Sequence, residues 1–302
     1  MELNLIDLTL EIRTSSKAAL SQRLLFAGEE FAETCRTMAC RFPTRQCAQC
    51  SSRASCDWQF IFGQQLSHDP DALRRHQKPP LPFIFSIPMP DILDDREGVL
   101  ECGLVIVGRA ICCLDMLLSG FNVLLAAEHG SLCNSLLLTA SRDYQGALYP
   151  LANPASLSPS ENLVIMSAEN ILISCPWECT NLRIRLVSPL RLVARGRQLY
   201  RFDFSTFACS IMRRVTSLAY YYCGYEFDCD FKELSNLTRT VICRGDFFTA
   251  ATGGRRKTAG ISGSGCFSGD FGGLLPFLML GSYFHTGKNA SSGMGAFELD
   301  IT

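Results

Sequence analysis

Residues 272–299 read GGLLPFLMLGSYFHTGKNASSGMGAFEL. Apolar side chains fill the first half of this stretch and predict a short helix ending near Phe284, while residues 294–301 read as a closing strand. Between them, a loop rich in Gly and Ser opens with His285 and carries Lys288. Glycine suits positions where the backbone approaches a ligand closely or takes a positive φ. The stretch therefore predicts backbone amides and a cation presented to a phosphate.

The remainder of the chain supplies the partners of this last helix and strand. Strands are predicted at residues 3–13, 81–88, 99–108, 131–141, 163–174, 182–194, 238–248 and 259–271. Helices are predicted at residues 15–38, 110–128 and 204–222. Two successive βαββαβ units form two tandem ferredoxin-like (RRM-like) domains of the α+β class. We place these domains at residues 1–178 and 179–302, with a cysteine-rich knuckle inserted in the first at about residues 35–60.

Charge is unevenly distributed along the chain. The 302 residues carry a net charge of −1, and 47% of them are hydrophobic, which is enough for well-formed cores. Residues 181–260 hold fourteen Lys or Arg against six Asp or Glu, a net charge of +8, so the other residues sum to −9. A basic C-terminal half joined to an acidic N-terminal half is typical of a protein that grips a polyanion with one part.

The sequence contains sixteen cysteines, whose expected state depends on the cellular compartment of the protein. The first residues lack the basic start and apolar run of a signal peptide, so we expect a cytoplasmic protein whose cysteines are free, buried or metal-bound. The longest apolar run, residues 103–127, contains Arg109, Asp115 and Asn122. A helix that crosses a membrane rarely tolerates such residues, so we expect no membrane segment.

Three segments resemble one known family. Residues 188–224 contain an R-R-x-x-x-L-A-Y run that starts at Arg213 and Arg214. The opening stretch matches H-x-G-K-x-x-x-x-G-x-G through His285, Gly287, Lys288, Gly293 and Gly295. Residues 80–83 read P-x-P-F, and residues 107–110 read V-G-R-A. These motifs resemble the CRISPR-associated endoribonucleases that cut precursor crRNA at its repeats, the Cas-six family of the RAMP superfamily.

This resemblance implies a metal-independent endoribonuclease that needs no cofactor for catalysis. The 2′-hydroxyl of the RNA would attack the scissile phosphate and leave a 2′,3′-cyclic phosphate. The implied partner is the stem-loop of CRISPR repeat RNA, and the protein could remain on the 3′ hairpin beside other CRISPR effector subunits. Two alternatives remain at this point: a non-catalytic crRNA-binding RAMP subunit, and a zinc or iron–sulfur protein that does not act on RNA.

The family places a catalytic histidine in or after the first helix, and residues 27–36 contain none. The chain therefore resembles type IV-like variants that rely on arginine. Arg23 and Arg36 become catalytic candidates, acting by positioning and charge stabilisation rather than as bases. His285 is the third candidate, with two readings: RNA contact or proton transfer, or a structural bond to a helix-end carbonyl.

A basic set of residues in the second half is expected to bind RNA, because arginine grips phosphate in a bidentate manner. The candidates are Arg183, Arg185, Arg191, Arg195, Arg197, Arg213, Arg214, Arg255, Arg256 and Lys257, together with Gly287, Lys288, Gly293 and Gly295 of the loop.

The knuckle holds Cys40, Cys47, Cys50 and Cys56, spaced C-x6-C-x2-C-x5-C. Four thiolates in a short segment suit a structural zinc ion. A 4Fe–4S cluster is the rival ligand, and reduced free cysteines are the third reading. Such a site would staple the knuckle rather than perform the chemistry.

Overall fold

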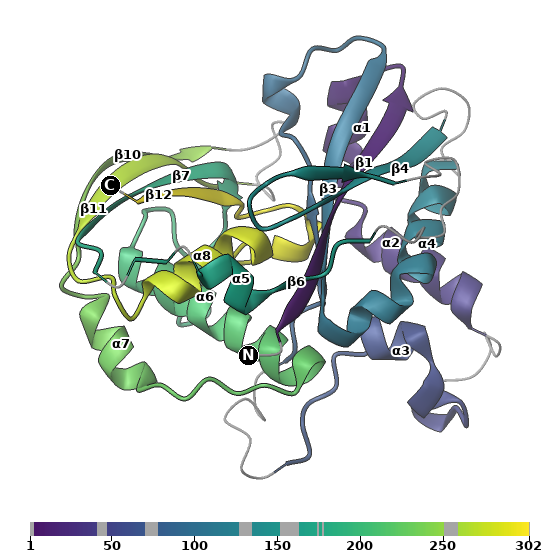
Figure 1. The fold of residues 1–302 in the computed structure, drawn as a ribbon. Coiled ribbons are helices and arrows are strands. Elements are labelled where there is room, and N and C mark those ends of the chain that lie inside the picture. Colours follow the sequence, from purple (N-terminus) through teal and green to yellow (C-terminus); the bar gives the residue numbers. More distant parts are fainter. Residues whose placement is uncertain are drawn as a thin grey trace.

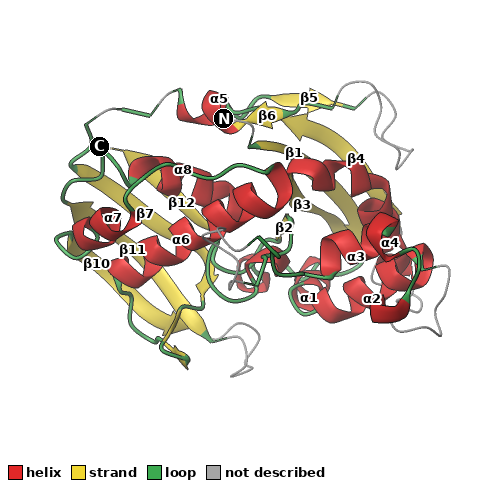
Figure 2. Cartoon of the chain, turned by 90° about the horizontal axis from the view of Figure 1, so that it is seen from below, coloured by secondary structure: helices red, strands yellow, loops and turns green. Residues whose placement is uncertain are grey.

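The computed structural model describes residues 3–40, 47–69, 78–126, 135–151, 163–173, 175–176, 178–250 and 259–301. Its main feature is a pair of antiparallel sheets, each covered on one face by helices (Figures 1 and 2). The first sheet has the strand order β2-β3-β1-β4-β5, and the second has the order β10-β11-β7-β12. The α+β prediction with two ferredoxin-like units is confirmed, because the first strand of each unit lies between its third and fourth strands.

The first unit is built around one long strand, β1. Its strands are β1 (Asn4–Thr14), β2 (Phe83–Ser86), β3 (Gly98–Val107), β4 (Ser135–Arg142), β5 (Leu148–Pro150) and β6 (Met166–Ser167). Its helices are α1 (Lys17–Leu24), α2 (Gly28–Ala39), α3 (Asp57–Phe62), α4 (Leu114–Ala126) and α5 (Ala168–Leu172). Short 3-10 turns lie at Cys47–Gln49, Arg53–Ser55, Pro90–Ile92 and Gly108–Cys113. Ile6, Leu8, Leu10 and Ile12 of β1 are buried in one core with α1, α2 and α4.

The second unit repeats the arrangement with a small hairpin added. Its strands are β7 (Asn181–Leu190), β8 (Val193–Ala194), β9 (Arg197–Gln198), β10 (Ile242–Ala250), β11 (Gly260–Ser268) and β12 (Phe297–Ile301). Its helices are α6 (Phe204–Leu218), α7 (Phe231–Leu237) and α8 (Leu275–Phe284), with a π-helical turn at Ala219–Cys223 and a 3-10 turn, η8, at Ala290–Ser292. Helices α6 and α8 pack on β7 and close the second core.

The two units share part of a core. Leu5 of β1 and Leu3 just before it, Ile84 of β2, and Val105 and Val107 of β3 are buried together with residues of α6 and α8. One face of the first sheet thus packs against the helices of its own unit, and part of the other face packs against the second unit. Burying each such side chain contributes roughly 1.5–3 kcal/mol, so this shared core holds the two units together. The predicted boundary after residue 178 lies between α5 and β7.

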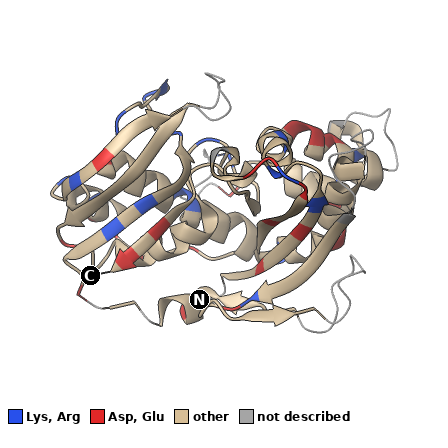
Figure 3. Ribbon diagram, turned by 90° about the horizontal axis from the view of Figure 1, so that it is seen from above, with Lys and Arg blue, Asp and Glu red and all other residues tan. Residues whose placement is uncertain are grey.

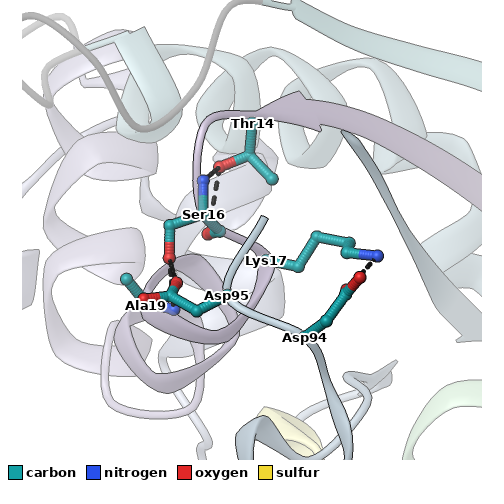
Figure 4. A network of polar contacts seen from close by, with 6 residues as sticks. All are labelled: Thr14, Ser16, Lys17, Ala19, Asp94 and Asp95. Carbon is teal, nitrogen blue, oxygen red and sulfur yellow. Dashed lines mark hydrogen bonds and ion pairs between the residues drawn. The ribbon is translucent and has the colours of Figure 1, made fainter. Parts of the chain in front are cut away.

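The start of α1 shows why the chain turns where the sequence predicts (Figure 4). Ser16 takes an extended backbone, and its hydroxyl accepts a hydrogen bond from the Ala19 amide at 3.1 Å. Such a cap satisfies a helix-end donor and stabilises by about 1 kcal/mol. The same hydroxyl donates to Asp95, and Lys17 pairs with Asp94. The loop before β3 is thereby fastened to the first helix.

Three sequence predictions fail locally. The single helix expected from residue 15 to 38 is two helices, because the chain turns at residues 25–27 so that both can bury apolar side chains. The strand expected at 163–174 is the short β6 followed by α5, whose first turn Ser167 caps. Helix α7 was missed, although Asp230 caps it by accepting from the amides of Lys232 and Glu233.

One helical stretch, Gly108–Ala126, is long and apolar enough to cross a membrane by length and composition, but half of it is buried inside the fold. Its α4 part contributes seven buried residues between the first sheet and α2. A core helix passes the same test as a membrane span, so the stretch gives no argument for a membrane.

Candidate functional site

The glycine loop after α8 lies where the two units meet. A side-chain atom placed on Gly28 at the start of α2 would lie 2.9 Å from Ser292 Oγ, and one placed on Gly293 would lie 3.2 Å from Phe85 O of β2. Ser292 and Gly293 therefore contact the first unit, although the loop belongs to the second. The loop is held against both α2 and the first sheet.

The glycines of this loop are required by contacts within the protein. Gly287 has φ 84° and an added Cβ would lie 2.6 Å from Arg191 O, while Gly295 has φ 68° and its Cβ would lie 1.9 Å from Thr286 O. Gly293 (φ 95°) and Gly295 are buried. A Cβ at any of these sites meets a strained backbone or a clash. The sequence pattern located these glycines, but the close approach they permit is to the chain itself.

Most amides of the loop are also used internally. The Lys288 amide donates to Arg191 O at 2.9 Å, the Gly295 amide donates to Pro189 O at 3.1 Å, and the Thr286 amide donates to Gly295 O at 3.1 Å. These hydrogen bonds fasten the loop to the end of β7. An amide already bonded to a carbonyl is not free to hold a phosphate. The Lys288 side chain is exposed, so it is a part of the loop that is free to meet an anion.

His285 is a buried residue at the C-terminal end of α8. It is 3% exposed, and its Nε2 lies 3.3 Å from Ser86 Oγ of β2 in the first unit. Burial, and then the positive charge of Arg214, lower the pKa of the His285 imidazole from 6.5 to about 3. The ring is therefore neutral at physiological pH. A buried neutral ring is poorly placed to exchange protons with RNA, which argues against the first predicted reading. The role is structural, but its side-chain partner is Ser86 Oγ rather than the helix-end carbonyl of the second reading.

The backbone at His285 is strained. Its φ of 53° with ψ of 177° lies in a region that is essentially reserved for glycine. Such a conformation costs about 1–3 kcal/mol and persists only where neighbouring contacts impose it. Here those contacts come from Ser86 on one side and from Arg214, which holds the preceding carbonyl, on the other.

Arg213 and Arg214 are neighbours in the sequence with opposite environments. The Arg214 guanidinium donates to Phe284 O at 2.7 Å through Nε and to Ser291 Oγ at 3.1 Å through Nη2. Burial lowers the pKa of Arg214 to about 10, so it stays charged. Arg213 is exposed on the adjacent face of α6. The structure therefore gives Arg214 a clamping role inside the fold and leaves Arg213 facing solvent.

The hairpin β8–β9 brings further cations to the same loop. Arg195 and Gly196 form its two-residue turn with φ values of 50° and 76°. Arg191, at the base of the hairpin, accepts the Lys288 amide on its carbonyl, and its Nη2 donates to Gln198 Oε1 at 3.4 Å. Arg191, Arg195, Arg197, Arg213 and Lys288 are named here the loop cations. They come from three segments, which are the hairpin with its base, α6 and the glycine loop itself, and the Lys288–Arg191 backbone bond joins the first to the last.

Arg183 and Arg185 lie elsewhere, on the exposed face of β7. Arg185 pairs with Glu298 of β12, with Nε at 3.0 Å from the carboxylate, and Arg183 stands opposite Asp300 in register. Figure 3 shows blue and red segments on neighbouring strands of this sheet. Acidic neighbours offset these two arginines, which weakens their case as phosphate ligands. Arg255, Arg256 and Lys257 lie outside the described residues.

The arginines proposed for catalysis are separated. Arg23 is on α1, pairs with Glu30 of α2 at 2.8 Å, and lies next to the turn that contacts the glycine loop. Arg36 stands 5.5 Å above the ring of Trp58 and lies 3.6 Å from Glu33. It lines the cavity of the knuckle together with all four cysteines. Arg23 thus borders the loop, whereas Arg36 belongs to the knuckle.

Cys40, Cys47, Cys50 and Cys56 all line one small cavity of about 20 Å³. The four thiols are free, and within the described ranges no group of three or more His, Cys, Asp or Glu side chains is arranged to hold a metal ion. A four-thiol donor set fits tetrahedral zinc in its chemistry. The residues thus supply the right ligands around one cavity, and zinc stays a prediction.

We expect the purified protein to carry about one zinc ion per chain, because four thiolates around one cavity supply the complete ligand set of a structural zinc site. Elemental analysis by mass spectrometry measures this directly, and absorbance near the visible range separates zinc from an iron–sulfur cluster. Cys47→Ser with Cys50→Ser should lose the metal, and Cys243→Ser, an exposed cysteine on β10, should keep it. Folded protein free of both metals would remove the knuckle site.

The sequence analysis missed an ionisable pair on neighbouring strands of the first sheet. Asp7 of β1 lies 3.7 Å from Arg142 of β4, and both line a cleft of about 560 Å³ with Tyr283, Glu298 and Asp300. Burial raises the pKa of Asp7 to about 6, against the opposing charge of Arg142. The signal was present in the sequence, since Asp7 is a carboxylate between apolar residues of a central strand. The acidic lining makes this cleft unsuited to a phosphate backbone.

Two protein-family models match parts of the chain. Residues 184–297 match the family described as CRISPR-associated endoribonuclease Cas6, and residues 28–145 match a family described as an N-terminal domain. No curated protein sequence matches the chain.

Solved structures share the fold over nearly the whole length. A Cas6 product complex of Thermus thermophilus has a TM-score of 0.57 and 13% identity, covering 98% of this chain and 100% of the other. A second Cas6 product complex has a TM-score of 0.52 and 15% identity, covering 99% and 100%. A partial Cas6-RT-Cas1–Cas2 complex has a TM-score of 0.56 and 13% identity, covering 99% of this chain.

The chain spans 46% of the length of the chain it matches in that last complex. Identities this low establish the fold alone, whereas the family match rests on residues 184–297, which carry the glycine loop, α6 and the loop cations. Both units have the fold of solved Cas6 structures, and the second unit, residues 184–297, belongs to the Cas6 family of CRISPR-associated proteins.

Proposed function

We propose that this protein binds CRISPR repeat RNA and cleaves precursor crRNA without a metal ion, through attack of the RNA 2′-hydroxyl on the neighbouring phosphate. The observation that carries the proposal is the fastening of the glycine loop to the β8–β9 hairpin by the Lys288 amide and Arg191 carbonyl. That bond sets Lys288 beside the arginines of the hairpin. A cluster of cations supplied by rigid elements is suited to hold an RNA phosphate.

The chemistry would depend on charge and position. The reaction needs the phosphate held in line with the 2′-hydroxyl, and stabilisation of the extra negative charge as the new bond forms. Lys288 lies on the loop of the second unit, and Arg23 lies on α1 of the first unit, two residues before Leu25, which contacts Gly293 of that loop. Each can donate hydrogen bonds to a phosphate oxygen, and neither is a base at neutral pH. His285 fixes the loop from beneath and takes no proton there.

One observation favours a second candidate function. In the described part of the chain, the loop region offers no exposed histidine. His285 is buried, and His68 belongs to a different segment, before β2. The neighbour of His68, Ser67, hydrogen-bonds to Tyr220 and Tyr221 of the π-helical turn. A site without a titrating group suits a non-catalytic crRNA-binding subunit of a CRISPR complex. Such a protein would hold the 3′ hairpin of the RNA through the same loop cations.

A cleavage assay on repeat RNA in excess EDTA distinguishes the two. We expect a single cut that leaves a 2′,3′-cyclic phosphate, and no cut on RNA with one 2′-deoxynucleotide at the scissile position. Lys288→Ala should lower the cleavage rate by about tenfold or more, as expected for one lost charge contact at the reacting phosphate. Tight binding without cleavage would establish the subunit function instead. Absence of RNA binding at moderate salt would overturn both and favour a metal protein unrelated to RNA.

A further inference from the structure

A deep pocket lies between the two helices α1 and α2, the first sheet and the glycine loop. Its volume is about 420 Å³. Its walls are aromatic and aliphatic, with Phe31, Phe83, Phe85 and Phe121 at the base and Trp58 at one side. Its rim is polar and includes Glu29, Gln64, Asn289 and Ser292. Apolar walls with a few polar groups at the mouth are the usual form of a small-molecule site.

The rings in the base of the pocket are fixed by one another. Phe85 stacks on Phe121 with centroids 4.9 Å apart, and Phe31 meets Phe83 and Phe85 edge-on at 5.6 and 5.5 Å. The Trp58 indole is held by its Nε1 donating to Ala32 O at 2.8 Å. Fixed aromatic walls favour a flat aromatic ligand, because no side chain needs to be ordered when it binds.

Phe26 stands apart from this cluster. It lies in the turn between α1 and α2, lines the same pocket, and is 40% exposed. Within the residues that the structure describes, Phe26 makes no ring–ring contact, unlike the rings below it. An exposed aromatic face at the mouth of an aromatic pocket is a platform on which a nucleobase can stack.

Two residues of the pocket rim have an unusual backbone conformation. Gln64 and Asn289 both have positive φ, at 45° and 64°. Backbone of this kind gathers at functional sites, where surrounding structure imposes it. Both side chains are amides, which offer donors and an acceptor. Gln64 Nε2 already donates to Pro79 O, so Gln64 offers mainly its Oε1, while Asn289 is exposed and can pair with the edge of a base.

Positively charged residues on both sides of the pocket mouth indicate that the base belongs to a nucleic acid. Arg23 precedes Leu24 on one side of the pocket, and Lys288 precedes Asn289 on the other. Both cations are outside the aromatic walls, so they suit the phosphates on either side of an inserted nucleotide. We propose that this pocket takes one unpaired nucleobase of the bound RNA, turned out of the chain and stacked on Phe26. The proposal rests on the RNA-binding function given above.

Trp58 provides a direct signal of occupancy. The sequence has two tryptophans, so Trp177→Phe leaves Trp58 as the single tryptophan, which can be excited selectively over tyrosine. A base entering the pocket should quench Trp58 fluorescence. A series of repeat RNAs, each with one abasic nucleotide at a successive position, then maps the base. We expect a single position whose loss abolishes the quenching and weakens binding about tenfold, the size expected for one lost base–aromatic stack.

Matched variants test the pocket from the protein side. Phe26→Ala should weaken binding of intact RNA about tenfold and make it insensitive to the abasic position, while Phe26→Tyr should restore both. Ala32→Leu, which fills the pocket from α2, should act like Phe26→Ala, and Thr37→Leu on the exposed face of α2 should not. Thermal melting confirms that each variant is folded.

The outcomes separate this inference from the function on which it rests. RNA that binds and is cut, with no abasic position affecting Trp58 or affinity, overturns the pocket and leaves the proposed function standing. Phe26→Ala with wild-type affinity does the same. Protein that binds no repeat RNA overturns both at once.

Discussion

His285→Gln will remove a strong acid sensitivity from this protein. The free energy of unfolding of the wild type, measured relative to that of the variant, should fall by about 3 kcal/mol between pH 7 and pH 4. The measurement is urea unfolding of both proteins at a series of pH values. Gln is close to His in size and can still meet Ser86 Oγ, so the variant changes the titrating group more than the packing.

The sign follows from the direction of the pKa shift. Burial lowers the pKa of His285 from 6.5 to about 3, so the folded state holds the ring neutral. Above pH 6.5 the ring is neutral in both states, and its contribution is fully present. As the pH falls below 6.5, the unfolded chain takes up a proton that the folded protein refuses, and stability is lost until about pH 3. Each pH unit in that window corresponds to about 1.4 kcal/mol.

The comparison must be made against the variant because Asp7 acts in the opposite direction. Burial raises its pKa from 3.8 to about 6, so its contribution is present at low pH and lost as the pH rises through 6. Between pH 7 and pH 4 Asp7 should add about 2 kcal/mol and mask most of the His285 effect in the wild type. Subtracting the His285→Gln curve cancels Asp7, which is common to both.

His68→Gln is the matched control, since it makes the same exchange of histidine for glutamine at an exposed position. A constant difference between wild type and His285→Gln from pH 7 to 4 would contradict the buried neutral ring. It would also return His285 to the list of groups that can exchange a proton with RNA.

The sequence predicted the fold well because its signals were local and periodic. Ile6, Leu8, Leu10 and Ile12 alternate along β1 and all point into one core, and Ser16 sits where a helix cap was expected. The same reasoning failed for α2, whose start lacks a side-chain cap, and for α7. The capping residue of α7, Asp230, was visible, but the short helix it starts has little apolar periodicity.

The site was predicted less well, since environment rather than residue type decides what a cation does. Arg213 and Arg214 form one sequence motif, yet consecutive residues of a helix point about 100° apart, so one faces solvent and the other faces α8. Likewise, Gly287 and Gly295 were placed correctly, but the carbonyls that require them belong to the chain. The pocket at Phe26 draws residues from segments far apart in sequence, and no single motif encodes it.

Arg214→Met will destabilise the fold, and Arg213→Met will weaken RNA binding without doing so. Removing the Arg214 guanidinium leaves Phe284 O and Ser291 Oγ without their donors. Each buried group left unpaired costs about 1–3 kcal/mol, so we expect a total loss of about 2–4 kcal/mol and a Tm lower by roughly 3–6 °C. Arg213→Met changes an exposed helix position, where the effect on stability should stay within about 0.5 kcal/mol.

For RNA binding by folded protein, we expect Arg213→Met to have the larger effect and Arg214→Met the smaller one. If Arg213 contacts a phosphate, Arg213→Met reduces the slope of log affinity against log salt by about 1, the signature of one lost contact. Arg214→Met, measured well below its Tm, should keep the wild-type slope, because its guanidinium is engaged inside the fold. Thermal melting and filter binding at several salt concentrations give both quantities. Equal salt slopes for Arg213→Met and wild type would place the RNA away from α6, and a wild-type Tm for Arg214→Met would show that the glycine loop stands without its clamp.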